Sequence, residues 1–235
     1  MRPALRLAAC CAALLLAAGA ASAADQVRQI GVFVKPFYEA GYTLVDTPRV
    51  AVDPLYDKLL ASTKRADIVK ARDAIAAAPE LVKPTTLMVL AIRLYDTGLR
   101  DDAVFWFYAA RDRYATMDAV LDMRSLTLVG LAKAIDDFTA AIAPAINGYA
   151  FCDVAQQQAQ EDRAIDWTAK HPYRLLESED LPAQADDRNK ALGEALGGLQ
   201  VKAAHAKAFL AKPENLQEMK DLRAHNDADA RFCWK

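Results

Sequence analysis

Apolar side chains recur every third or fourth residue over most of the chain beyond Asp53, a spacing typical of helices that bury one face. Start and stop signals divide this pattern, because Asp53 precedes Pro54 and Gly98 follows a periodic run. The sequence therefore predicts about eight helices. They run from 54, from about 63 to 78, from about 86 to 97, from 101, from about 125 to 143, from 153 to 170, from 188 to 211 and from 213.

Two of the predicted helices contain residues that disturb helices. Pro144, followed by Asn147-Gly148, is expected to end the helix that begins near residue 125. Gly193, Gly197 and Gly198 interrupt the next-to-last helix. Because glycine in a helix interior costs about 1 kcal/mol relative to alanine, we expect a bend or a close helix–helix approach there.

Residues 30–52 follow a different pattern, in which β-branched and aromatic runs alternate with Pro and Gly. This pattern predicts an extended arm or a small hairpin, which must pack on the helices to be stable. Residues 173–187 are polar and acidic and predict a loop. The expected fold is mainly α: an irregular helical bundle over residues 24–235, in one domain, with a small extended N-terminal element.

The first 23 residues have the form of a secretory signal peptide. Arg2 and Arg6 precede an apolar run over 7–18, and Ala21-Ser22-Ala23 is a small-residue cleavage site. The alternative is an uncleaved membrane anchor, for which the run is short. Since no later segment reaches roughly 18 apolar residues, no membrane insertion is expected after cleavage of residues 1–23.

Cleavage leaves Cys152 and Cys233 as the two cysteines of the exported chain, since the other two lie within residues 1–23. Two cysteines in an exported protein favour one disulfide, which would close a loop of about 80 residues. The alternative is a nucleophilic or metal-binding thiol. Such a thiol needs a nearby base, and no histidine adjoins either cysteine in the sequence.

Charge and motifs argue against several classes of function. Loss of Arg2 and Arg6 changes the net charge from -2 to about -4, which argues against nucleic acid as a partner. The chain lacks the sequence patterns of zinc proteases, serine hydrolases and nucleotide-binding loops, so we expect neither a cofactor nor a catalytic role. Paired carboxylates at 136–137 and 161–162, with Asp166, are compatible with a glycosidase, although such helical pairs are usually solvated.

Aromatic residues gather in two segments. Residues 104–108 read Val-Phe-Trp-Phe-Tyr, which favours a central helix of the bundle over a binding surface. Phe33, Phe37, Tyr38 and Tyr42 lie in the predicted arm, where they either pack on the helices or anchor a partner.

Residues 94–110 resemble one tetratricopeptide or Sel1-type helical hairpin, with Leu94-Tyr95, Gly98, Ala103, Trp106-Phe107 and Ala110 at the corresponding spacing. Residues 87–98 and 103–114, together with 34–40, resemble a set of exported bacterial proteins similar to periplasmic immunity proteins, which are encoded beside antibacterial effectors.

The resemblance implies a periplasmic protein that binds and neutralises a cognate toxic effector. The alternative is a non-catalytic helical scaffold or peptide-binding protein of the bacterial envelope. The aromatic arm and the acidic loop are the candidate partner-binding surfaces. Their residues are Phe37, Tyr38, Tyr42, Glu177, Glu179 and Asp180.

Overall fold

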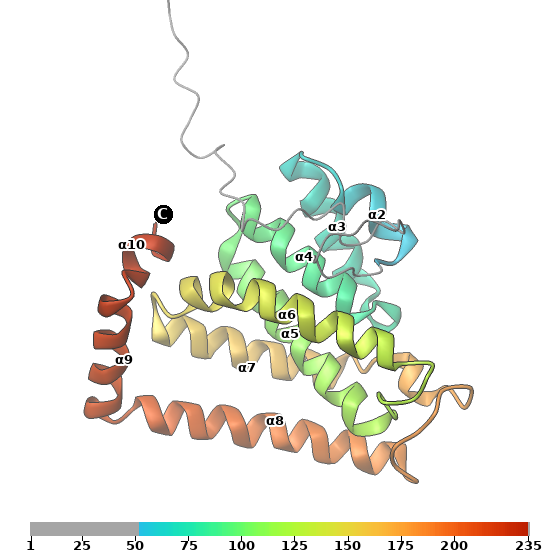
Figure 1. The fold of residues 1–235 in the computed structure, drawn as a ribbon. Helices are drawn as coiled ribbons and strands as arrows, with labels where there is room; N and C mark the ends of the chain where they lie inside the picture. Colours follow the sequence, from blue (N-terminus) through green and yellow to red (C-terminus); the bar gives the residue numbers. More distant parts are fainter. Residues whose placement is uncertain (1–51, 235) are drawn as a thin grey trace, which may run out of the picture.

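The computed structural model describes residues 52–234, which form nine α-helices and no β-strand (Figure 1). The mainly helical fold is as predicted. The helices are α2 (Pro54–Leu60), α3 (Arg65–Ala77), α4 (Pro84–Asp96), α5 (Arg100–Val120), α6 (Val129–Ala150), α7 (Val154–Lys170), α8 (Arg188–Leu210), α9 (Pro213–His225) and α10 (Ala228–Phe232), with 3₁₀ helices η2 (Pro79–Leu81) and η3 (Arg174–Glu177). Except for Val52, the predicted arm, with Phe37, Tyr38 and Tyr42, lies outside the described residues.

Helices α4 and α5 form the hairpin at the centre of the molecule. Gly98 turns the chain between them with φ of +80°, a conformation that favours glycine. Every side chain from 103 to 110 is buried, and only Arg93 of α4 is partly exposed. The aromatic run over 104–108 therefore belongs to the core, which confirms the prediction of a central helix.

The other helices surround this hairpin (Figure 1). Helices α2 and α3 pack beside α4, where Arg93 donates hydrogen bonds to the carbonyls of Leu60 and Ser62. Helix α6 contacts both α4 and α5, while α7 and α8 pack on α5. Among residues 52–234, no helix combines the length and hydropathy needed to span a bilayer.

Asp53 occupies the N-cap position of α2, as predicted, but its carboxylate does not cap that helix. It accepts hydrogen bonds from the backbone N–H of Lys83 and from the Thr86 hydroxyl at the start of α4. Asp53 therefore ties the beginning of α2 to the beginning of the central hairpin.

A buried arginine holds three separate segments together. Arg113 of α5 is fully buried, and its guanidinium donates to the carbonyls of Pro79, Val82 and His171. It also lies 4.7 Å from the centre of the Trp167 ring. Burial lowers the pKa of Arg113 to about 10, so the side chain stays charged at neutral pH.

The predicted end of the helix at Pro144 is wrong, because α6 continues through Pro144 to Ala150. Proline removes one backbone hydrogen bond and strains the preceding turn. Here Ile142, Ile146 and Ala150 continue one buried face beyond the proline, and their burial offsets that cost. The helix also begins at Val129, four residues later than expected.

The predicted disturbance at the three glycines of α8 is also wrong. Helix α8 runs unbroken from Arg188 to Leu210 (Figure 1). A Cβ placed at Gly193, Gly197 or Gly198 would meet no atom within 4 Å, so no helix approaches closely there. Because their surroundings are open, these glycines cost helix propensity without allowing closer packing.

Candidate binding cleft

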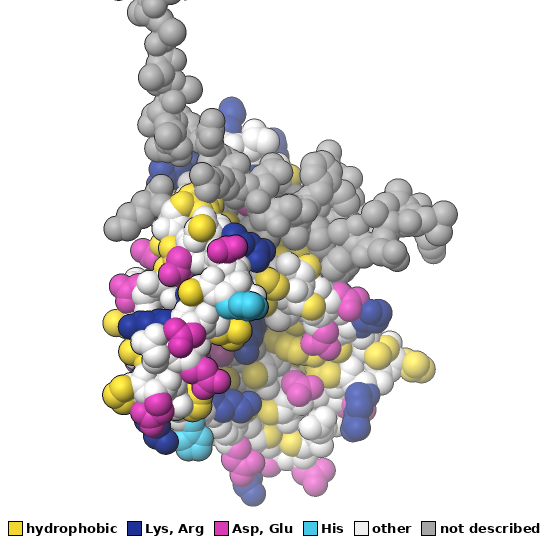
Figure 2. Space-filling model, turned by 60° about the vertical axis from the view of Figure 1, so that its left-hand side comes forward, with side chains coloured by type: hydrophobic (Ala, Val, Ile, Leu, Met, Phe, Trp, Pro, Cys, Tyr) yellow, Lys and Arg dark blue, Asp and Glu magenta, His cyan; other side chains and the backbone are white. Residues whose placement is uncertain are grey.

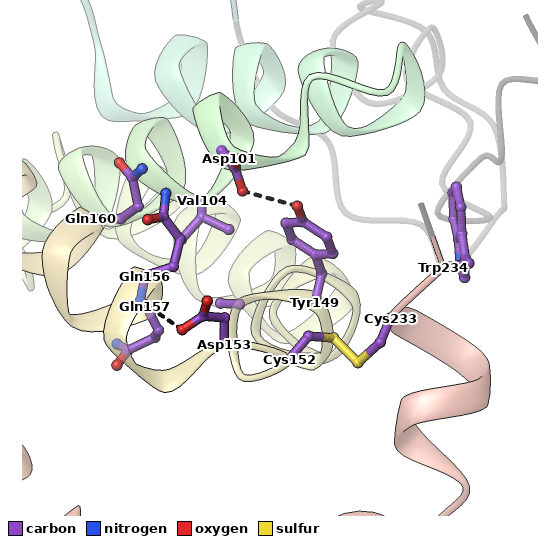
Figure 3. A pocket seen from close by; sticks show the side chains of 11 residues that line it. Asp101, Val104, Tyr149, Cys152, Asp153, Gln156, Gln157, Gln160, Cys233 and Trp234 are labelled. Atoms are coloured by element: carbon purple, nitrogen blue, oxygen red, sulfur yellow. Dashed lines mark hydrogen bonds between the residues drawn. A yellow bond between two sulfur atoms is a disulfide. The ribbon is translucent and has the colours of Figure 1, made fainter. Parts of the chain in front are cut away.

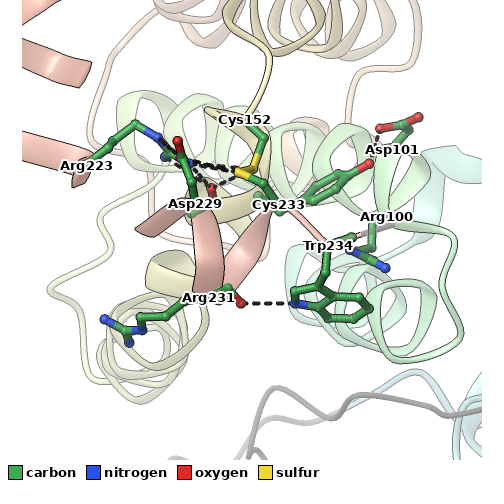
Figure 4. The surroundings of a disulfide bond; sticks show 10 residues. Arg100, Asp101, Cys152, Arg223, Asp229, Arg231, Cys233 and Trp234 are labelled. Atoms are coloured by element: carbon green, nitrogen blue, oxygen red, sulfur yellow. Dashed lines mark hydrogen bonds and ion pairs between the residues drawn. A yellow bond between two sulfur atoms is a disulfide. The ribbon is translucent and has the colours of Figure 1, made fainter. Parts of the chain in front are cut away.

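The C-terminus is fastened to the body by a disulfide between Cys152 and Cys233, 81 positions apart (Figure 4). Cys152 lies in the turn between α6 and α7. Cys233 follows α10, the last helix. The predicted pairing is confirmed, and it holds the chain end that would otherwise fray.

Noncovalent contacts hold the same C-terminal segment in place. Phe232 packs on Gly148, and Arg223 donates to the Gly148 carbonyl. Arg223 also donates to Asp229 Oδ1 (Figure 4). We call residues 228–234 the C-terminal strap, since they cross from α9 back to the end of α6.

Trp234 of this strap stacks on Arg100, the first residue of α5. The Arg100 guanidinium lies 3.4 Å from the centre of the indole ring and donates to the Trp234 carbonyl oxygen. The indole Nε1 donates to the Arg231 carbonyl at 3.0 Å. The same guanidinium lies 5.1 Å from the centre of the Tyr149 ring, so Arg100 contacts both the strap and the end of α6.

A cleft of about 490 Å³ opens beside this strap (Figure 3). The start of α5 contributes Asp101 and Val104, the end of α6 contributes Tyr149 and Ala150, and the strap contributes Cys233 and Trp234. The rest of its lining comes from the turn before α7, with Cys152 and Asp153, and from the first turns of α7, with Gln156, Gln157 and Gln160. Segments distant in sequence therefore meet at this cleft.

Hydrogen bonds fix several of the polar side chains in the cleft. Tyr149 donates its hydroxyl proton to Asp101 Oδ1 at 2.9 Å, and Asp153 caps α7 by accepting from the Gln156 N–H (Figure 3). Burial, followed by the bond to Asp101, raises the pKa of Tyr149 to about 12, so the phenol stays protonated at neutral pH.

Gln157 lies at the base of the cleft and is 6 % exposed. Its amide Nε2 donates to the Tyr108 hydroxyl at 3.3 Å and to Glu161 Oε2 at 3.2 Å. These two bonds hold the amide group in a fixed orientation. No described residue donates a hydrogen bond to its Oε1.

The cleft is electronegative. Its lining includes two carboxylates, three side-chain amides and one phenol, but no Lys, Arg or His among the described residues. The carboxylates and amide oxygens of this lining are hydrogen-bond acceptors, and the negative charge favours a positively charged ligand.

A second groove, of about 540 Å³, separates α9 from the start of α7. Leu216 and Met219 of α9 face Val154 and Ala155 across it. Figure 2 shows hydrophobic side chains scattered among acidic and basic ones on this side of the molecule. The disulfide lies between this groove and the cleft, since Cys152 lines both.

The predicted loop over 173–187 has a structure of its own. It contains η3, and its Tyr173 and Leu176 are buried in a small cluster. Glu177, Glu179 and Asp180 are exposed. Ala183 pairs with Leu121, just beyond the end of α5, whereas the cleft lies at the start of that helix, about 30 Å away along its axis. The structure thus does not bring the predicted acidic residues to the cleft.

Most carboxylates that could have formed a glycosidase pair are exposed and engaged with lysines. Asp137, Asp162 and Asp166 pair with Lys133, Lys207 and Lys170, respectively. Among the described residues, no group of His, Cys, Asp and Glu is arranged to hold a metal ion.

Asp112 of α5 is a carboxylate that the sequence analysis missed. Its Oδ2 is buried and has no hydrogen-bond partner. Burial, with a smaller effect from the charge of Glu161, raises the pKa of Asp112 to about 7. Asp112 does not line any of the described clefts.

Sequence comparison finds one significant relative among curated proteins. An uncharacterized protein of Haemophilus influenzae (strain Rd) is 32% identical over 213 residues, which cover 89% of this chain and 81% of that protein. No family model matches the chain, and no solved structure matches it.

Proposed function

This chain belongs to the same family as the Haemophilus influenzae protein, and we propose that it is an exported immunity protein. It binds a toxic effector protein in the periplasm and neutralises it by protein–protein interaction, without catalysis. The predicted signal over residues 1–23 supports export, and a disulfide is consistent with an oxidising compartment.

The observation that carries this proposal is the small burial of α8 and α9. Ala203 is the one buried residue of the 23 in α8, and α9 has none. Large apolar side chains remain exposed on both helices: Val201 by 54%, Phe209 by 54% and Leu222 by 61%. These two helices therefore present apolar side chains that this chain itself does not cover and that a protein partner would bury.

Covalent attachment supports the same function. Helix α8 contacts the body, with Lys207 paired to Asp162 of α7, and the disulfide fixes the chain beyond α9. The two helices are therefore held in position before a partner arrives. Preorganised surfaces lose less conformational entropy on binding, as the high affinity of a toxin inhibitor requires.

A competition assay tests the proposal. Cells that lack this gene and its neighbouring toxin gene are mixed with sister cells that deliver the effector, and survival is counted. We expect sensitivity in the deletion strain, rescue by the full chain, and no rescue by a chain without residues 1–23. Equal survival of deleted and rescued cells would contradict the immunity function.

Surface variants test the surface that carries the proposal. Val201→Asp combined with Phe209→Asp should abolish rescue, because charges would be placed in the contact. Leu126→Asp is the matched control: Leu126 is 99% exposed and lies in the α5–α6 connection, so rescue should persist.

The cleft favours a second candidate function, a peptide-binding protein of the envelope, because buried amides line it beside carboxylates. Affinity capture with the exported chain separates the two functions. Recovery of a neighbouring-gene toxin supports immunity, whereas recovery of resident envelope proteins alone supports the envelope binder.

A further inference from the structure

We propose that the cleft between α5, α6, α7 and the C-terminal strap receives an arginine side chain of the protein partner. The inference deepens the proposed function and rests on it for the identity of that partner. It names the cleft as a binding site and a guanidinium as its ligand.

The first argument is the buried amide at the base of the cleft. Gln157 is 6 % exposed, and the two acceptors of its Nε2 leave its Oε1 without a donor among the described residues. This oxygen is not among the buried side-chain atoms that lack a partner, so it is accessible to solvent and can accept a hydrogen bond from an entering N–H group. Gln160, 9% exposed, adds a second buried amide to the lining.

The second argument is the charge of the cleft. Asp101 and Asp153 each use one carboxylate oxygen in an internal hydrogen bond, to Tyr149 and to the Gln156 N–H. Each carboxylate keeps further lone pairs for a ligand. Arg100 is the nearest cation in sequence; it stacks on Trp234 and is not part of the lining, but its guanidinium lies 5.1 Å from the centre of the Tyr149 ring, at the edge of the cleft.

The third argument is the geometry of the donors that would satisfy these acceptors. The acceptors come from separate helices: Asp101 from α5, and Asp153 and Gln157 from the beginning of α7. A guanidinium presents five N–H donors in one plane, whereas an ammonium presents three at a single point. Arginine is therefore the basic side chain that fits acceptors distributed around a cleft.

Binding of short peptides tests the inference. The probes are the blocked tripeptides Gly-Arg-Gly, Gly-Lys-Gly and Gly-Glu-Gly, and N,N′-diacetylchitobiose as a neutral sugar. They are titrated into the oxidised ¹⁵N-labelled chain from residue 24 to 235, and amide chemical shifts are followed. We expect millimolar binding of Gly-Arg-Gly, weaker binding of Gly-Lys-Gly, and shifts centred on Asp101, Asp153 and Gln157.

Matched variants show whether the charge of the carboxylates matters. Asp101→Asn combined with Asp153→Asn keeps an acceptor for Tyr149 and a good N-cap for α7. This variant should bind Gly-Arg-Gly at least about tenfold more weakly. Asp118→Asn combined with Asp186→Asn makes the same charge change at two exposed sites and should bind like the unmodified chain. Thermal unfolding checks that both variants fold.

Three results would overturn the inference: no shifts in the cleft with Gly-Arg-Gly, equal binding of Gly-Glu-Gly, or binding of N,N′-diacetylchitobiose alone. Effector capture separates its failure from that of the proposed function. If the Asp101→Asn, Asp153→Asn variant loses the tripeptide but captures the effector normally, the arginine contact is wrong and immunity stands. If the tripeptide binds but no effector is captured, immunity is wrong and the cleft remains an arginine site.

Discussion

Phe232 packs on Gly148 so closely that a Cβ at position 148 would come within 2.5 Å of the phenyl ring. The contact joins the end of α6 to the C-terminal strap, beside the disulfide. The strap can therefore occupy this position only because residue 148 has no side chain.

Gly148→Ala should displace Phe232 and loosen the strap. Overpacking of this kind typically costs about 1–3 kcal/mol, which urea unfolding of the oxidised chain would measure. Gly130→Ala in the same helix is the control. A Cβ there would meet nothing within 4 Å, so this variant should be as stable as the unmodified chain or up to about 1 kcal/mol more stable. Equal effects of the two substitutions would contradict the packing argument.

Removal of the disulfide should destabilise the whole chain. Cysteines 81 positions apart close a long loop, and the chain-entropy model assigns such a loop about 4 kcal/mol. Cys152→Ser combined with Cys233→Ser should lower the free energy of unfolding by this order, and reductant should act similarly on the unmodified chain. Reductant should have no further effect on the double variant, and any effect there would point to another cause.

Asp112 should make stability depend on pH. Burial raises its pKa from 3.8 to about 7, so the folded state favours the protonated carboxyl more than the unfolded state does. This contribution to stability is complete below about pH 4 and is lost as pH rises through 7. Arg111 and Glu161 are the charged groups that act on it, and they partly oppose each other.

Asp112→Asn should remove this dependence. We expect the variant to be about 1–2 kcal/mol more stable than the unmodified chain at pH 8, and the difference to shrink or reverse at pH 4. Thermal unfolding over this pH range gives the measurement. Asp118→Asn on the exposed side of the same helix serves as the comparison, and an identical pH profile for the two variants would exclude Asp112 as the source.

The sequence was sufficient to predict turns and helix starts, because these depend on residues close to one another in the chain. The turn at Gly98, the start of α7 at Asp153 and the start of α9 at Pro213 all follow from capping chemistry. The disulfide followed from the predicted export signal and the cysteine count. The passage of α6 through Pro144 could not be predicted, because it depends on the tertiary burial of Ile146 and Ala150.

The cleft could not be predicted for a related reason. It joins the start of α5, the end of α6 and the chain terminus, and only the tertiary fold brings them together. Gln156, Gln157 and Gln160 were visible in the sequence, but the burial of Gln157 depends on its bonds to Tyr108 and Glu161. A helical stretch of glutamines without that context is typical of a solvated face.

Substitution of Arg113 tests how much its buried hydrogen bonds contribute to the stability of the core. Its guanidinium donates to three backbone carbonyls, at Pro79, Val82 and His171, while Trp167 and Tyr173 lie beside the same group. A lysine at this position keeps the charge but lacks the planar fork that reaches several carbonyls. Arg113→Lys should therefore cost about 2–4 kcal/mol in urea unfolding.

Arg111→Lys on the exposed side of α5 is the matched substitution and should change stability by less than about 0.5 kcal/mol. Arg113→Met separates charge from hydrogen bonding, because it removes the buried cation while leaving the three carbonyls unsatisfied. If the hydrogen bonds carry the stability, Arg113→Met should be at least as unstable as Arg113→Lys. A methionine variant as stable as the unmodified chain would show instead that desolvation of the guanidinium cancels the contribution of its three bonds.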